Sequence, residues 1–135
     1  MTPITVEVSV GELADKISIL EIKRARLTVP AQLDNVRSEL ATLRTAWQAA
    51  GVNSEALQEL CAQLKDVNVT LWNIEDDIRQ HESRQDFGPS FVALARRVYI
   101  TNDKRAALKR DINVLAGSRL FEEKSYANYQ APTDR

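Results

Sequence analysis

Apolar residues recur along most of the chain at alternating spacings of three and four positions. This spacing places a stripe of apolar side chains along an α-helix and is typical of helical bundles and coiled coils. Four such stretches predict four helices. They run from about Val10 to Thr28, from Pro30 to the glycine at 51, for roughly thirty residues after Ser54, and from about Ser90 to Ala116.

Residues that cap or interrupt helices lie at the boundaries of these stretches. Ser9 and Glu12 form a capping box, in which each side chain can satisfy a free backbone amide at the start of a helix. The sequence DFGP at residues 86–89 separates the last two stretches. The pattern predicts an all-α protein, with an antiparallel bundle of four main helices over residues 10–117 inside one domain spanning residues 1–135.

The two ends of the sequence differ from the helical stretches. Ile4, Val6 and Val8 alternate with polar residues, which predicts a short strand over residues 1–9. A single strand cannot satisfy its own backbone amides, so it would pair with residues 119–126, the favoured arrangement, or with its own copy across a two-fold axis. The tail, residues 118–135, is apolar enough to dock on the bundle, and its last residues are expected to be disordered.

The composition is that of an ordinary folded protein, with 44% hydrophobic and 27% charged residues. A net charge of −1 excludes the strong overall attraction on which general nucleic-acid and anionic-membrane binders rely. No stretch approaches the ~20 apolar residues of a membrane span. The first ten residues lack the basic and apolar regions of a signal peptide, so we expect a cytoplasmic location.

Cysteine and histidine, the residues most often found as nucleophiles and transition-metal ligands, are scarce. Cys61 and His81 are the only cysteine and histidine, which excludes an intrachain disulfide and metal sites that need several thiolates or imidazoles. They lie on one predicted helix, roughly 30 Å apart, so they cannot act together as nucleophile and base. No nucleotide-binding, protease or hydrolase motif is found. We therefore expect neither a metal nor a cofactor and assign no catalytic residue.

Polar residues interrupt or flank the apolar stripes at similar heights in the predicted bundle. Folding the helices back at their turns brings arginines from three helices near Asn68, with acidic residues about one turn away. The residues of this polar layer are Arg24, Arg37, Asn68, Glu75, Arg97 and Arg105. Two interpretations remain open: a structural layer whose buried charges pair with one another, or a pocket whose guanidinium groups bind the carboxylate or phosphate of a small anionic ligand.

The four predicted helices are unequal in length. The first two are roughly 27–30 Å long and the last two roughly 40–45 Å, so about two turns of the longer pair lack cover. The uncovered end lies near residues 86–89 and carries Ile74, Ile78, Phe87, Phe91 and Leu94. A second copy offering the same patch would cover both, which predicts a homodimer with this end as its interface.

Three segments, VEVSVGELADKISILEIK, DFGPSFVALARRVYITNDKRAALKRDIN and EEKSYANY, resemble those of a small bacterial family of unknown function. The resemblance covers Val6 to Tyr129 and implies a compact, cytoplasmic, mostly helical protein, without assigning an activity, cofactor or site residue. The expected architecture is also similar to that of the all-helical chorismate mutases, which place arginines from several helices around a dicarboxylate, although their first-helix pattern is not matched.

Two functions are expected on these grounds. The leading one is a non-enzymatic helical module that binds a second copy of itself or another protein. The alternative is a ligand-binding protein or enzyme that takes a small carboxylate or phosphate in the arginine-lined layer. Nucleic acid and membranes are not expected partners.

Overall fold

The computed structural model describes residues 1–130, in which four α-helices account for the regular secondary structure. The helices are α1 (Val10–Arg26), α2 (Pro30–Ala50), α3 (Glu55–Ser83) and α4 (Pro89–Ala116). The all-α prediction is confirmed, and each helix begins and ends within two residues of its predicted position. None of these helices is both long and apolar enough to cross a membrane. The disorder predicted for the last residues concerns 131–135, which lie outside the described part of the chain.

The helix ends follow from capping residues in the sequence. Ser9 Oγ accepts a hydrogen bond from the Glu12 amide at 3.1 Å. Gly51 and Gly117 end α2 and α4 with φ values of 67° and 66°, a region that glycine enters without strain. Only the Ser9 half of the predicted capping box forms, because the Glu12 carboxylate bonds to Lys109 instead, at 2.7 Å.

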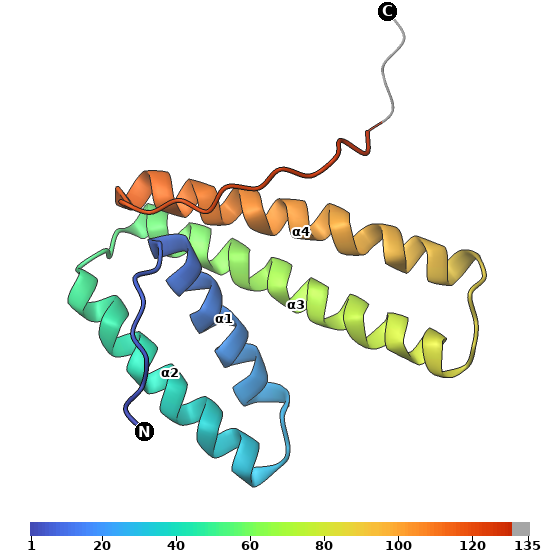
Figure 1. Cartoon of the computed structure of the whole chain (residues 1–135), viewed down its shortest axis with the longest axis horizontal. Helices are drawn as coiled ribbons and strands as arrows, with labels where there is room; N and C mark the ends of the chain where they lie inside the picture. Colours follow the sequence, from blue (N-terminus) through green and yellow to red (C-terminus); the bar gives the residue numbers. More distant parts are fainter. Residues whose placement is uncertain (131–135) are drawn as a thin grey trace, which may run out of the picture.

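The four helices form two pairs that meet at α1 (Figure 1). α3 and α4 lie side by side along most of their length and are joined by the loop 84–88. α1 packs against all three other helices. α2, by contrast, comes close to the backbone of α1 alone. The predicted packing of the second helix along the third is therefore wrong, because α1 lies between them (Figure 1).

Two apolar clusters form the core, one on each side of α1. The cluster between α1 and α2 consists of Leu20, Val36 and Leu40. The cluster where α1 meets α3 and α4 consists of Ala14, Leu57, Leu64 and Ile112. α1 thus has two buried faces, and its predicted apolar stripe, which includes Ile17 and Leu20, is the one that faces α2.

The predicted N-terminal strand is not confirmed, since residues 1–9 form neither helix nor strand in the single chain. A strand needs a backbone partner, and no backbone hydrogen bond joins residues 1–9 to residues 118–130. Side chains make the connection instead. Arg119 pairs with Glu7 at 2.7 Å, and Ser118 Oγ accepts a hydrogen bond from the Val10 amide at 3.2 Å.

The segment that follows α4 runs back along the same helix (Figure 1). The Tyr129 ring lies 5.0 Å from the Tyr99 ring, and the Arg110 guanidinium lies 5.5 Å from the centre of the Phe121 ring. Aromatic contacts therefore hold the described part of the tail, residues 118–130, against α4.

Candidate functional site

A buried carboxylate lies where α1, α3 and α4 meet. Asp15 is only 1% exposed. One turn earlier, Gly11 lets α1 approach α4 closely: a Cβ there would lie 2.9 Å from Asn113 Oδ1 and closer still to the carbonyl oxygen of Lys109. Asn113 Oδ1 accepts a hydrogen bond from the Gly11 amide at 2.6 Å. These contacts fix the start of α1 against α4, and with it the position of Asp15.

One amide and one guanidinium hold the Asp15 carboxylate. Asn68 Nδ2 and Arg105 Nε each donate a hydrogen bond to Asp15 Oδ1 at 2.9 Å, and a second nitrogen of Arg105 donates to Oδ2. Asn68 Nδ2 also donates to Ser18 Oγ at 2.7 Å, and Ser18 donates to the backbone carbonyl of Asp15 at 2.8 Å. Both carboxylate oxygens therefore have donors, which offsets the loss of water on burial.

Lys109 connects this buried group to the surface. Its ammonium lies 2.7 Å from Glu12 Oε2, 2.9 Å from Glu122 Oε2 and 3.8 Å from Asp15 Oδ2. Burial lowers the pKa of Lys109, but hydrogen bonds with Glu12 and Glu122 outweigh that effect, so the pKa lies above its ordinary value. The hydrogen bond from Lys109 lowers the pKa of Glu122, and the one with Asp15 raises the pKa of Arg105. Both cations stay charged near neutral pH.

These side chains form a polar cluster that is complete without a ligand. We call it the Asp15 cluster; its members are Glu12, Asp15, Ser18, Asn68, Arg105, Lys109 and Glu122. Within residues 1–130, every buried side-chain nitrogen and oxygen has a hydrogen-bond partner. The two cations of the cluster face three carboxylates, so no positive charge is left over for an anion. The geometry supports the structural interpretation of the polar layer.

Two of the six residues predicted for the polar layer, Asn68 and Arg105, belong to the Asp15 cluster. Arg24, Arg37 and Arg97 are exposed, on α1, α2 and α4 respectively. The structure does not bring these three arginines to Asn68, because α2 packs away from α3 and because the last turn of α1 and one face of α4 point to solvent.

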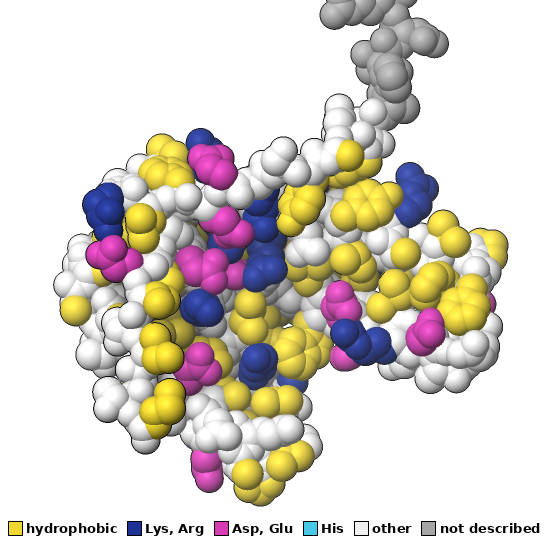
Figure 2. Space-filling model, viewed as in Figure 1, with side chains coloured by type: hydrophobic (Ala, Val, Ile, Leu, Met, Phe, Trp, Pro, Cys, Tyr) yellow, Lys and Arg dark blue, Asp and Glu magenta, His cyan; other side chains and the backbone are white. Residues whose placement is uncertain are grey.

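The sixth predicted residue, Glu75, lies in a groove next to the cluster. The groove has a volume of about 490 Å³ and is lined by residues of α1, α3 and α4, including Asn68 and Arg105. Figure 2 shows the molecule hollowed between α1 and the projecting end of α3 and α4. Neither arginine of the groove is free, since Arg79 pairs with Glu75 and Arg105 pairs with Asp15. The groove is therefore poorly suited to an anion.

The prediction missed Asp15 because it treated the first helix as having a single buried face. A signal for a second face was present. Gly11, Ala14, Ser18 and Ile22 recur at spacings of three and four on the side of α1 opposite Leu20. Asp15 lies within this stripe of mostly small residues, and an acidic residue in a buried stripe indicates a partner of opposite charge.

The loop end of α3 and α4 is the second candidate site. It projects beyond α1 and α2, and hydrophobic side chains reach its surface (Figures 1 and 2). Phe87 is 49% and Val92 51% exposed, and the Phe87 and Phe91 rings pack edge to face with centroids 5.2 Å apart. Ile74, predicted for this patch, is buried, and Val92, which the prediction missed, is exposed. We call this patch the hairpin end; its residues are Ile78, Phe87, Phe91, Val92 and Leu94.

The single cysteine and histidine lie at opposite ends of α3, Cys61 away from both sites and His81 beside the hairpin end. Cys61 is a free, half-buried thiol. His81 Nδ1 lies 2.9 Å from the Asp77 carbonyl oxygen, and Nε2 lies 4.0 Å from the Asp86 carboxylate. In the part of the chain that the structure describes, no group of three or more His, Cys, Asp and Glu residues is placed to hold a metal ion.

The fold and the Asp15 cluster define a small all-α protein organised around a buried ion-pair network. A family model described as a family of unknown function (DUF6165) matches residues 4–134, so the chain belongs to this family. The resemblance to a family of unknown function is thereby confirmed. No curated protein and no solved structure matches the chain.

Proposed function

We propose that this protein is a non-enzymatic interaction module that forms a dimer through the hairpin end. The observation that carries the proposal is the contrast between the two candidate sites. The Asp15 cluster is filled by its own side chains, whereas the hairpin end presents aromatic and aliphatic side chains to solvent. Exposed apolar patches rimmed by polar residues are typical of protein contact surfaces.

The charges around the hairpin end support a second copy of this chain as the partner. The exposed charged residues near it are Asp76, Asp77 and Glu82 on α3, Arg84 in the loop that follows, and Arg96 and Arg97 on α4. The contacts between charged or titratable groups that the described structure forms at this end use other residues: Arg79 pairs with Glu75, and His81 Nε2 lies 4.0 Å from Asp86. A two-fold axis would place the acidic residues of one copy opposite the arginines of the other, so one surface is complementary to itself.

The alternative function, binding of a small carboxylate or phosphate in the arginine layer, has less support. Arg105 already binds Asp15 through two nitrogens. Arg24, Arg37 and Arg97 lie exposed on three different helices. The layer therefore lacks the converging guanidinium groups that such a ligand needs.

We also propose that the protein acts in the cytoplasm. The presence of only one cysteine, and so of no intrachain disulfide, supports this location, because small secreted domains are often rich in disulfides.

Sedimentation equilibrium at neutral pH and tens of micromolar protein tests the dimer. We expect the mass of a dimer for the wild type and of a monomer for Phe91→Asp, because the interface would bury an unpaired carboxylate. The matched control is Val114→Asp, which changes an exposed valine near the other end of α4 and should leave the dimer intact. Circular dichroism checks that both variants keep their helices.

Charge-reversal substitutions test whether the partner is a second copy of this chain. Reversing Arg96 and Arg97 to Glu should weaken the dimer, and adding Asp76→Arg and Asp77→Arg to the same chain should restore it. A wild-type protein that sediments as a monomer would contradict the proposal. So would equal masses for Phe91→Asp and Val114→Asp.

A further inference from the structure

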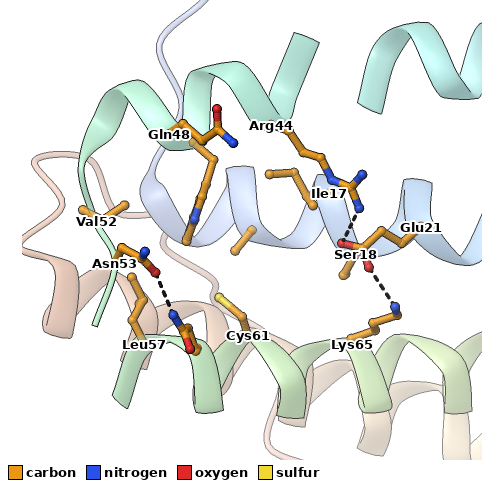
Figure 3. Close-up of a pocket in the computed structure, with 13 residues that line it drawn as sticks. Ile17, Ser18, Glu21, Arg44, Gln48, Val52, Asn53, Leu57, Cys61 and Lys65 are labelled. Carbon is orange, nitrogen blue, oxygen red and sulfur yellow. Dashed lines mark hydrogen bonds and ion pairs between the residues drawn. The ribbon is translucent and has the colours of Figure 1, made fainter. Parts of the chain in front are cut away.

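A cavity of about 360 Å³ opens between α1, α2 and α3 (Figure 3). It exists because α2 packs along α1 and diverges from α3, which leaves the space between Trp47 and Cys61 unfilled. Small-molecule sites in proteins have volumes of about 300–1,000 Å³. None of the arginines that the sequence analysis assigned to the polar layer lines this cavity.

One wall of the cavity carries three charged side chains, each from a different helix. The Glu21 carboxylate of α1 lies 2.7 Å from Lys65 Nζ of α3 and 3.6 Å from the Arg44 guanidinium of α2 (Figure 3). These three are the charged residues that line the cavity, so the wall holds one more positive than negative charge. Arg44 and Lys65 are 43% and 45% exposed, and each has N–H groups besides those that face Glu21.

Much of the remaining lining is apolar. It includes Ala14, Ile17, Trp47, Val52 and Leu57, and the Cys61 thiol lies among them. Burial, together with the nearby Glu21, raises the pKa of Cys61, so the thiol stays neutral. The amides of Asn53 and Gln58 bond to each other at 2.8 Å. The cavity therefore combines an apolar space with a cationic wall.

We infer that this cavity binds a small monocarboxylate with an apolar body, such as an aryl- or alkyl-substituted acid. The apolar body packs between Trp47 and Cys61, and the carboxylate accepts hydrogen bonds from Arg44 and Lys65, which Glu21 holds in place. A single carboxylate matches the single surplus positive charge. A phosphate monoester would bring a second negative charge close to Glu21 without a further cation to pair with it.

The site is distinct from the proposed dimer interface. It uses the first half of α3, from Leu57 to Lys65, whereas the hairpin end begins at Ile78 on the same helix. The thirteen positions from Lys65 to Ile78 correspond to roughly 20 Å of helix. Ligand binding can therefore be measured whether or not the protein forms a dimer.

A fluorescence titration tests the inference. Trp47 lines the cavity and Trp72 lies in the groove beside Glu75, so Trp72→Phe leaves an indole in the cavity alone. The probe is 4-phenylbutyrate, and the matched neutral compound is 4-phenylbutyramide. We expect a saturable change in Trp47 emission with the acid and about tenfold weaker binding of the amide, because the charge-assisted hydrogen bonds are lost. The acid should also slow the alkylation of Cys61 by N-ethylmaleimide.

Substitutions in the same Trp72→Phe background locate the ligand. Arg44→Gln and Lys65→Gln should each weaken binding of the acid by about tenfold and leave binding of the amide unchanged. Arg37→Gln, also on α2 but outside the cavity, is the matched control and should bind both compounds as before. Cys61→Leu narrows the apolar part of the cavity and should weaken binding of both compounds, with circular dichroism showing that the chain is folded.

Three results would overturn the inference. The first is equal affinity for the acid and the amide, or no saturable change up to about 10 mM acid. The second is a loss of binding in Arg37→Gln as large as that in Arg44→Gln. The third is unchanged binding in folded Cys61→Leu, which would place the ligand outside the cavity.

Discussion

Asp15 and Arg105 both lose water when the chain folds. The Asp15 side chain is 2% exposed and that of Arg105 is 30% exposed. The attraction between such partners offsets their desolvation only when the geometry is good, as it is where two nitrogens of Arg105 meet two oxygens of Asp15. Removing one partner therefore costs more than the intact pair contributes, because the remaining charge has neither water nor a full set of donors.

We expect Arg105→Ala to lower the free energy of unfolding by about 3–5 kcal/mol, since Asp15 keeps only Asn68 and the more distant Lys109. Asp15→Ala should also destabilise, but the double variant should lose about 1–3 kcal/mol less than the two single losses combined. Urea denaturation of the four proteins measures this coupling. Arg24→Ala, at an exposed position outside both the cluster and the hairpin end, serves as the control and should stay within about 0.5 kcal/mol of the wild type. Strictly additive losses would show that Asp15 and Arg105 do not interact.

The sequence predicted two residues of the Asp15 cluster but not Asp15, the carboxylate at its centre. Asn68 and Arg105 could be recognised because each interrupts or flanks an apolar stripe. Asp15 was missed because its neighbours Ala14 and Ser18 are small, so that their side of the helix was interpreted as facing solvent. Burial of Asp15 follows from the close approach of α4, which is a tertiary contact.

Among the elements, α1 and α4 dock where Gly11 faces a backbone carbonyl. A Cβ at Gly11 would overlap the Lys109 oxygen, and a helix backbone cannot give way as a flexible side chain can. We expect Gly11→Ala to lower the free energy of unfolding by about 1–3 kcal/mol, although alanine is the better helix former. Gly88→Ala is the comparison variant: its Cβ would meet its nearest neighbour at 3.4 Å, so it should lose only the small advantage that glycine has over alanine as the N-cap of α4. Thermal unfolding compares the two, and equal melting temperatures would exclude a tight contact at Gly11.

The ends of the elements could be predicted because their signals are local. Ser9 and Ser54 bond to an amide three residues further on, and Gly51 and Gly117 adopt the left-handed conformation that ends a helix. These interactions involve residues within one or two turns of each other, so spacing along the sequence is enough to find them.

The placement of the elements depends on contacts that no local pattern contains. The stripe with Ile17 and the stripe with Asp15 have the same helical period, and nothing near them shows which one faces α2 and which one faces α4. The alternation over residues 1–9 fits a strand, but the neighbouring chain offers side chains and no backbone partner. The second helix and the N-terminal segment were misplaced for these reasons.

For the whole molecule, the Asp15 cluster links stability to pH. The pKa of Lys109 in the folded protein lies above its ordinary value of 10.5, so the folded form holds this proton more tightly than the unfolded form. The stability from this group is complete below the unfolded-state value and is lost as pH rises through the folded-state value. We expect the free energy of unfolding, measured in urea at steps from about pH 8 to pH 11, to fall toward the alkaline end.

Lys109→Met should remove part of this alkaline loss, because the group that titrates is gone. Lys104→Met, at an exposed position on the same helix, is the control and should follow the wild-type profile. Profiles that run parallel for the wild type and Lys109→Met would mean that Lys109 does not carry the effect.

The hydrogen bond between Gly11 and Asn113 joins residues 102 positions apart, and it sets the order in which the protein can fold during synthesis. When α1 leaves the ribosome, α2 soon follows and covers one face through Leu20 and Leu40. The other face stays exposed to water until α3 and then α4 have been synthesised. Because much of that face consists of Gly11, Asp15 and Ser18, the nascent chain exposes little apolar surface there while it waits. The long loop closes at a modest entropic cost, since that cost grows only with the logarithm of loop length. The same buried charge that makes the finished core sensitive to substitution thus keeps this face of α1 polar until its partners are in place.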